Sequence, residues 1–510
     1  MGIVKRVRRW RWPTWLGLAV LLTGMAGALW TVAQGQTGLQ RQMIDSYYYF
    51  DAARSIQQTG LPDISWPQGP VNKFFPGYSY VLALTSALAG QEPHEAWRWL
   101  QLGLLFLLGP LTVLLLRGLG LSAAQAFVAG GVAAGNVLIL RWSAVPYSEL
   151  LCLVCLLGQG VLVVWRPESW RLCRQIVFCG LAGLAIATRV EALFFQPIFG
   201  VLDWRRARLV TSGLIAPAAW AAAGLGPVWL WTLWASAREA AGGLHYLAEG
   251  REEFSWVHYY QKLFTLASTS VRFHQFGSPD LFTHLGFRVL WYFFAAALIL
   301  TPRGLLGRQA LWAWVVVWVY WLGHSFWYFS SERYNLFLVP LFALLLVRMA
   351  AWFAMPGRPN EGHSAGKRSI MFWGIVAGIL ALQLNSWFVI LVHNIQINRN
   401  YSDRDYQNAA FYMDSPTPGG ILTDQAADFA YWQDRPVWFA LDVEAFNVGL
   451  LQEEADLRPV VEEHDIAWIA LRQPAEEYDV FDSIEQFSPQ VTVMEFDNER
   501  FMWLYALTRE

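Results

Sequence analysis

The first residues that could do chemistry lie in the run 43–54, which reads Met-Ile-Asp-Ser-Tyr-Tyr-Tyr-Phe-Asp-Ala-Ala-Arg. If this run is helical, one face carries Asp45, Tyr48, Tyr49 and Ala52, and Asp51 lies away from that face. A carboxylate becomes a useful general base when partial burial raises its pKa toward neutrality. Asp45 is therefore a candidate base. The alternative is a helix cap, because Asp at a helix start accepts hydrogen bonds from free backbone N–H groups.

A second set of ionisable residues stands at the edges of apolar segments. Glu149 begins one such segment, where a carboxylate is costly unless it faces protein or water. Arg189 and Glu191 interrupt apolar sequence in the same way, and Arg333 with Tyr334 opens a later apolar run. Capping is again the alternative for Glu149. These positions favour a polar site at one membrane face.

Lys73 belongs to the run Val-Asn-Lys-Phe-Phe-Pro-Gly-Tyr, which ends at Tyr78 and leads into an apolar piece, 74–90. This position places Lys73 at the depth of the lipid headgroups. A lysine there either binds a lipid phosphate as a point charge or extends its amine toward water.

The composition identifies the kind of protein that must position these residues. Of the 510 residues, 55% are hydrophobic and only 15% are charged, and the mean hydropathy is +0.31. The apolar residues gather in runs of about twenty, the length that spans a hydrocarbon core as a helix. The net charge of -2 gives no reason to expect a nucleic-acid partner. We therefore expect a multi-pass α-helical protein of the plasma or inner membrane, in contact with its lipids.

Charge patterning sets the expected topology. The basic N-terminus is interpreted as the cytoplasmic flank of a retained anchor, and the piece 74–90 is expected to lie along the membrane, since the basic loops then fall on the cytoplasmic side. About eleven spans are expected, near residues 14–33, 97–116, 123–140, 148–165, 175–188, 192–202, 210–234, 287–301, 310–326, 336–352 and 370–393.

The outer regions of this topology hold all the candidate residues. The transmembrane domain is expected over 1–393, with a first outer loop and juxtamembrane helices over 34–90 and a long outer loop over 235–286. Residues 394–510 are expected to form a small extracytoplasmic α/β domain. Its strands are predicted near 421–423, 437–441, 466–471, 491–496 and 501–507, with a helix over 426–433.

The order of these motifs resembles the integral-membrane glycosyltransferases of the GT-C fold. The branch it resembles (family 39-like) includes lipid A aminoarabinose transferase and the protein O-mannosyltransferases. The likeness covers about residues 10–235. It is carried by Asp45-Ser46 with Tyr49 and Asp51, by Thr59-Gly60, by Lys73 to Tyr78, by Glu149, and by Thr188-Arg189. Ser46 replaces the second acidic residue of an Asp-Glu pair, and Glu149 replaces an Asp.

By this resemblance, Asp45 is the catalytic carboxylate, Glu149 is the second acidic residue, and Lys73 and Arg189 hold the donor phosphate. Further candidate substrate-binding residues are Tyr49, Asp51, Tyr78, Glu191, Arg333 and Tyr334. No cofactor is required. A divalent cation, Mg²⁺ or Mn²⁺, could be bound by oxygen ligands such as Asp45 and Glu149.

The resemblance implies transfer of a sugar from a polyprenyl-phosphate donor to a lipid, glycan or protein acceptor on the outer face, with inversion. A polymerase or ligase of lipid-linked glycans would share this donor and sidedness. One alternative is a non-catalytic binding or assembly protein of the same fold. Another is a secondary transporter, which would tend to show internal repeats and charged or broken helices near the bilayer midplane.

Overall fold

The computed structural model describes most of the helical part of the chain and the core of its C-terminal sheet. The described residues are 12–35, 44–62, 65–66, 69–70, 75–165, 171–199, 226, 229–230, 233, 256–269, 302–325, 332–353, 370–381, 383–384, 387–388, 419–423, 437–439, 457–471, 475, 484–496 and 499–507. They fall into two compact units. The first holds Met1–Gly35, Arg98–Leu230 and Glu252–His393, and the second holds Gln36–Trp97, Trp231–Arg251 and Asn394–Glu510.

Long apolar helices dominate the first unit. Within the described residues, three segments are long and apolar enough to cross a membrane: Trp12–Ala33 in α2 (Trp12–Gly35), α5 (Pro93–Gly118), and Arg333–Ala351. A fourth is the pair α6 (Ala123–Ala134) and α7 (Val137–Ser143), if the two form one bent span. The predicted spans at 210–234 and 287–301 lie almost wholly outside the described residues.

The predicted continuous span over 123–140 is broken in the structure. α6 begins at a capping box formed by Ser122 and Gln125, and it ends at Gly135. Asn136 then starts α7 by accepting a 2.9 Å hydrogen bond from the backbone N–H of Leu138, and the two helices meet at 45°. Trp387 donates a 2.6 Å hydrogen bond to the carbonyl of Gly135, which satisfies a backbone group at the break.

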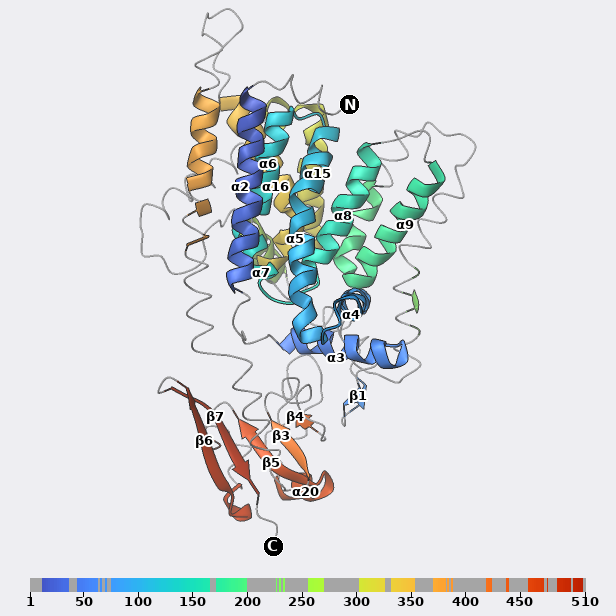
Figure 1. Cartoon of the computed structure of the whole chain (residues 1–510), viewed down its shortest axis with the longest axis vertical. Helices are drawn as coiled ribbons and strands as arrows, with labels where there is room; N and C mark the ends of the chain where they lie inside the picture. Colours follow the sequence, from blue (N-terminus) through green and yellow to red (C-terminus); the bar gives the residue numbers. More distant parts are fainter. Residues whose placement is uncertain are drawn as a thin grey trace, which may run out of the picture. The chain divides into compact units, whose positions relative to one another are not determined.

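Small residues bring α2 against α6, and the two helices run side by side in Figure 1. A Cβ atom on Gly17 would lie 2.7 Å from the carbonyl oxygen of Ala124, too close for any side chain. Such approach is typical of helix contacts in membranes, where apolar side chains gain little by leaving the lipid and backbone packing must supply the attraction.

Six further elements of the first unit surround its polar residues. They are α8 (Glu149–Val164), α9 (Arg171–Thr188), the 3₁₀ helices η2 (Val190–Phe194) and η3 (Glu332–Leu338), α13 (Trp256–Thr269) and α15 (Pro302–His324). α16 (Val339–Phe353) continues directly from η3. Gln159 of α8 and Gln196, which follows η2, exchange two amide hydrogen bonds of 3.0 and 3.1 Å. This buried pair ties the segment after Arg189 to α8.

In the second unit, α3 (Ile44–Thr59) packs on α4 (Gly77–Ala89). Gln57 donates a 2.8 Å hydrogen bond to the hydroxyl of Ser86 on the facing side of α4. The exposed side of α4 carries Tyr80, Leu84 and Leu88, which are 41%, 60% and 80% exposed. A helix of 13 residues is about 20 Å long, short of a hydrocarbon core of about 30 Å. Its length and apolar stripe suit the membrane-surface position predicted from charge. A two-residue ladder, β1 (Ser65–Trp66) with β2 (Gly69–Pro70), lies between the two helices in sequence.

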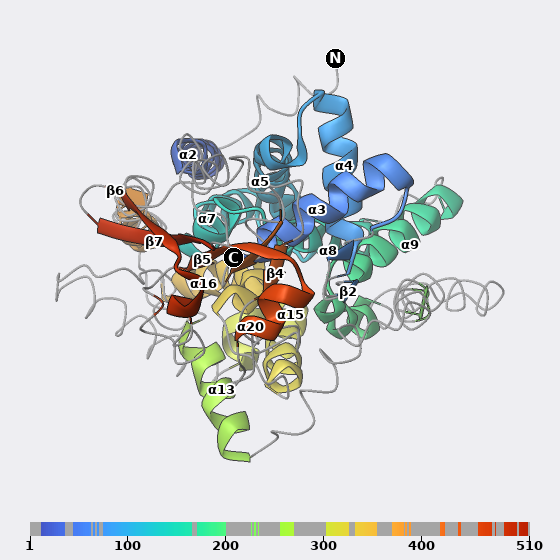
Figure 2. The same ribbon diagram turned by 90° about the horizontal axis from the view of Figure 1, so that it is seen from below.

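The C-terminal sheet has five strands in the order β4-β3-β5-β7-β6. β3 (Gly420–Thr423) pairs in parallel with β4 (Val437–Phe439) and with β5 (Ile466–Leu471). β5 pairs antiparallel with β7 (Glu499–Ala506), which also pairs with β6 (Gln490–Phe496), and the strands lie edge to edge in Figure 2. The five predicted strands are therefore confirmed, whereas the predicted helix at 426–433 lies outside the described residues.

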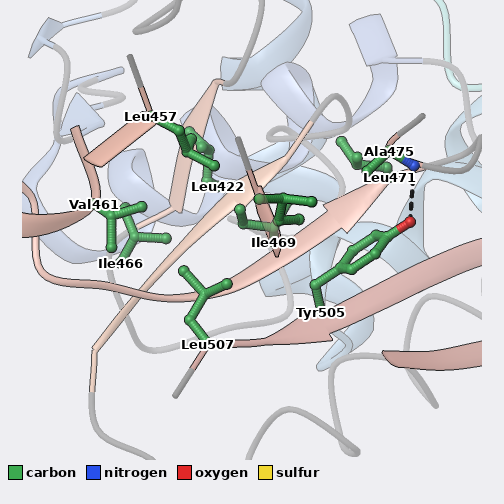
Figure 3. Packing of buried hydrophobic residues seen from close by; sticks show 10 residues of the cluster. Leu422, Leu457, Val461, Ile466, Ile469, Leu471, Ala475, Tyr505 and Leu507 are labelled. Carbon is green, nitrogen blue, oxygen red and sulfur yellow. Dashed lines mark hydrogen bonds between the residues drawn. The ribbon is translucent and has the colours of Figure 1, made fainter. Parts of the chain in front are cut away.

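The core of this sheet is apolar, with α20 (Leu457–Glu463) and the 3₁₀ helix η6 (Ile484–Phe487) covering it. Leu422, Leu457 and Ile469 are fully buried within it. The hydroxyl of Tyr505 accepts a 2.8 Å hydrogen bond from the backbone N–H of Ala475, as drawn in Figure 3. A small α/β fold is thus present, as the alternation of short strand-like and helix-like stretches predicts.

Candidate functional site

Arg189 joins two carboxylates inside the first unit. The residue has an extended backbone between α9 and η2, with φ −154° and ψ 130°, so the chain turns there. Its Nη1 lies 2.6 Å from Oε1 of Glu149, the first residue of α8. Its Nη2 and Nε donate to the two oxygens of Glu191 at 2.6 and 3.2 Å, a bidentate arrangement. A weaker bond of 3.3 Å runs from Nη1 to the hydroxyl of Ser148.

A second arginine shares Glu149. The Nε atom of Arg333 lies 3.5 Å from the same Oε1 atom that Arg189 contacts. Its guanidinium packs over the ring of Tyr147 at 5.2 Å and over that of Tyr334 at 5.6 Å. Arg189 also lies over Tyr334, at 5.7 Å. Aromatic faces attract cations, so these rings help to hold both guanidinium groups in place.

Aromatic and basic side chains extend this cluster toward α15 and α13. The imidazole ring of His324 stacks at 4.2 Å on Tyr334 and at 5.4 Å on Tyr320. The hydroxyl of Tyr320 donates a 2.9 Å hydrogen bond to the carbonyl of Tyr334. Lys262 of α13 is buried, with 7% exposure, and its charge acts on His324.

We define the charged cluster as Glu149, Arg189, Glu191, Lys262 and Arg333. The five side chains are buried or nearly so, with 12% exposure for that of Arg333. The cluster holds three cationic and two anionic side chains. Guanidinium and ammonium groups bind carboxylates and phosphates through charge-assisted hydrogen bonds. The charged cluster is therefore suited to an anionic group.

An apolar cavity of about 80 Å³ lies in the same unit. Side chains of α5, α8, α15, η3, α16 and the segment 195–199 line it, and all of its lining side chains are apolar. Phe195 and Phe337 line the cavity, and their rings lie 5.3 and 6.2 Å from Tyr320. Tyr320 in turn hydrogen-bonds the carbonyl of Tyr334, whose ring contacts Arg189 and Arg333 of the charged cluster. A polar end and an apolar chamber thus adjoin within one unit.

The structure brings together five of the residues expected from sequence: Glu149, Arg189, Glu191, Arg333 and Tyr334. The other candidates belong to the second unit. The backbone of Asp45 lies in the first turn of α3, but its side chain and all of Lys73 lie outside the described residues. Tyr49 of α3 and Tyr78 of α4 are buried against each other, with ring centroids 4.8 Å apart.

Asp51 is partly buried on α3. Burial raises the pKa of its carboxyl group from 3.8 to about 7, while the charge of Arg54, one turn along the helix, acts in the opposite direction. A carboxyl group that titrates near neutrality can accept or release a proton at physiological pH. Asp51 therefore has the property that the sequence led us to expect of Asp45.

Lys262, His324 and Ser148 were not identified from sequence. Lys262 and His324 had a detectable signal, because Lys262 stands among aromatic and apolar residues and His324 follows an apolar helical stretch. Within the described part of the chain, no group of three His, Cys, Asp or Glu side chains could hold a metal ion.

The chain has the fold of known GT-C glycosyltransferases. ArnT of Cupriavidus metallidurans superposes with a TM-score of 0.56 at 11% identity, covering 96% of this chain and 98% of that one. AglB, the oligosaccharyltransferase of Archaeoglobus fulgidus, gives 0.58 at 12% identity, covering 97% and 74%. AftD, a mycobacterial arabinofuranosyltransferase, gives 0.52 at 13%, covering 96% of this chain and 40% of its own. No family model and no curated protein matches the sequence.

The similarity to ArnT extends over nearly the whole of both chains, so the membrane helices and the C-terminal sheet are parts of one shared architecture. Together with the long apolar helices, this fold makes the chain an integral membrane protein. At such low identities the likeness establishes the fold, and the chemistry must be argued from the site.

Proposed function

We propose that this protein is a glycosyltransferase that moves a sugar from a polyprenyl-phosphate donor to a lipid, glycan or protein acceptor on the extracytoplasmic face of the membrane. The observation that carries the proposal is the connection of the charged cluster to the apolar cavity through aromatic residues that run from Tyr334 to Phe195 and Phe337. A polyprenyl phosphate has the same two parts, an anionic head and a long apolar chain.

The proteins that share the fold support this donor class. One structure of ArnT is bound to undecaprenyl phosphate, and AglB was solved with an inhibitory peptide and a dolichol-phosphate. Both ligands are polyprenyl phosphates. Two structures of the Archaeoglobus fulgidus oligosaccharyltransferase also contain a peptide, inhibitory in one and an acceptor in the other. These peptides are ligands of that enzyme and do not identify the acceptor of this chain, for which we keep lipid, glycan and protein.

Arg189, Arg333 and Lys73 would bind the donor phosphate. Positive charge at this place favours the transition state, because negative charge grows on the phosphate as the glycosidic bond breaks. Glu149 would orient both arginines through Oε1. Glu149 would therefore have two roles. It would position the two arginines, and it would also be the second acidic residue of the catalytic site, as the family resemblance implies.

Asp45 would be the general base. In the proposed step, a hydroxyl or amine of the acceptor attacks the anomeric carbon and transfers its proton to Asp45. The bond from that carbon to the phosphate oxygen breaks, and polyprenyl phosphate leaves with the electron pair. Attack from the face opposite the phosphate inverts the anomeric centre. No metal ion takes part in this scheme.

The orientation of the chain follows from charge. We propose that the N-terminus is cytoplasmic and that the C-terminal sheet is extracytoplasmic, since basic loops then lie in the cytoplasm. Glu149, Arg189 and Arg333 then stand at the outer ends of their helices, where a lipid-linked sugar is accessible.

The test is sugar transfer by membranes that contain the wild type or Asp45→Asn, supplied with polyprenyl-phosphate sugars. Asp465→Asn is the matched control, because Asp465 has φ 54° in a turn of the C-terminal domain, a conformation that Asn also adopts. We expect donor consumption by the wild type and the control and none by Asp45→Asn at equal protein levels. Full activity of Asp45→Asn would remove Asp45 from the mechanism. If the wild type consumes none of the donors, whichever lipid, glycan or protein acceptor is added, a non-catalytic binding protein is favoured.

A further inference from the structure

His324 has a hydrogen-bonding atom for which the described part of the chain provides no partner. The residue ends α15 and is 3% exposed. Its Nε2 atom is buried and makes no hydrogen bond. Buried polar atoms in proteins are nearly always satisfied, so an exception requires an explanation.

Glu149 presents a second such atom. Its Oε1 atom forms ion pairs with Arg189 and Arg333. Its Oε2 atom is buried and has no hydrogen-bond partner among the described residues. A chain of side-chain contacts joins the two residues. Tyr334 lies 4.2 Å from the ring of His324 and 5.7 Å from the guanidinium of Arg189, which in turn binds Glu149.

The chemistry of the two atoms limits what they can bind. A carboxylate oxygen only accepts hydrogen bonds, whereas imidazole donates from one nitrogen and accepts at the other. A phosphate would not bind at Glu149 Oε2, because the negatively charged carboxylate would repel the negatively charged phosphate. Hydroxyl groups both donate and accept, so a group bearing several hydroxyls satisfies both atoms.

We infer that His324 is a substrate-contacting residue whose Nε2 hydrogen-bonds a hydroxyl of the sugar on the donor, while Glu149 Oε2 accepts from a neighbouring hydroxyl. The inference rests on the proposed function. The arginines then bind the phosphate, and His324 with Glu149 binds the sugar attached to it.

A purely structural role accounts for the ring of His324 but not for its nitrogen. The stacking on Tyr320 and Tyr334 needs only an aromatic face, which phenylalanine supplies equally. His324→Phe therefore keeps the packing and removes the hydrogen bond. His324→Gln replaces the ring by an amide that both donates and accepts.

Two measurements on the purified full-length protein test the inference. The first is the affinity for undecaprenyl phosphate, which carries no sugar. The second is kcat/KM for the polyprenyl-phosphate sugar that the wild type consumes. Ser325→Ala is the matched control: its neighbouring buried hydroxyl is already satisfied by the carbonyl of Trp321 at 2.6 Å.

For His324→Phe we expect unchanged affinity for undecaprenyl phosphate and a fall in kcat/KM of about 10- to 100-fold, the effect of leaving a substrate hydroxyl unpaired. His324→Gln should recover part of the loss, and Ser325→Ala should behave as the wild type. Transfer by His324→Phe at the wild-type rate would overturn the inference, and so would a parallel loss of undecaprenyl phosphate binding. If the wild type itself neither binds that lipid nor transfers sugar, the proposed function fails and this inference fails with it.

Discussion

Nη1 of Arg189 donates a 2.6 Å hydrogen bond to Oε1 of Glu149, a residue 40 positions earlier in the chain, and both side chains are buried. The bond connects the end of α9 to the start of α8. Because the same guanidinium also holds Glu191, one arginine fixes three segments of the site. Breaking this arrangement leaves charges in a place that water does not reach.

Arg189→Met is expected to destabilise the protein strongly. It leaves the carboxylates of Glu149 and Glu191 buried with less compensation, and loss of one partner of a buried pair costs about 3–5 kcal/mol. The matched control is Arg54→Met, since Arg54 lies 3.8 Å from Glu92 with the two side chains 35% and 59% exposed. Loss of such a pair costs about 1 kcal/mol or less. Thermal unfolding of the purified proteins measures both, and equal shifts in Tm would contradict the account.

The Gln159–Gln196 pair predicts a non-additive pair of mutations. Gln196→Leu leaves the amide of Gln159 buried without its partner, at a cost of about 1–3 kcal/mol. The double variant Gln159→Leu/Gln196→Leu removes both amides, so its Tm should lie above that of either single variant. The measurement is thermal unfolding of all four proteins. A double variant that loses the sum of the two single effects would show that the amides do not act as a pair.

Asp51 predicts a pH-dependent effect on stability. Its folded-state pKa, about 7, is raised above the unfolded value of 3.8, so between these values the folded state holds a proton that the unfolded state has released. Stability from this group is therefore lost as the pH rises from about 4 to about 7. Asp51→Asn removes the titration, and its Tm advantage over the wild type should be larger at pH 8 than at pH 5. An advantage that stays constant with pH, or a loss at pH 8, would contradict a carboxyl group disfavoured by burial.

Local patterns predicted much of the fold. The strand at 466–471 is predicted by six consecutive apolar residues bounded by polar ones, and the structure has it with those bounds. Arg189 and Glu191 were identified by an equally local pattern, two charges in apolar sequence two positions apart, and the structure pairs them. Such features depend on residues that are neighbours in sequence, so they can be predicted from one sequence alone.

The partners that sequence did not predict are far apart in the chain. Lys262 and His324 lie on separate helices, and their meeting depends on how α13 and α15 pack, which no local pattern specifies. The break at Gly135 and Asn136 was also missed. The residues around it are apolar enough for a continuous span, and the break is marked by the hydrogen bond that Asn136 accepts from the backbone N–H of Leu138. The placing of Asp45 beside Glu149 in one outer site stays a prediction.

The central claim is that the arginines of the charged cluster stabilise a polyprenyl phosphate leaving group. The most direct test is the rate at which purified protein releases polyprenyl phosphate from a polyprenyl-phosphate sugar, measured for the wild type and Arg333→Gln. Arg348→Gln on α16 serves as the matched control, since Arg348 belongs to the same continuous segment but not to the cluster. We predict release by the wild type and the control, and a fall of about 10²- to 10³-fold for Arg333→Gln, the loss expected when one preorganised charge partner is removed. Release by Arg333→Gln at the wild-type rate would contradict the account.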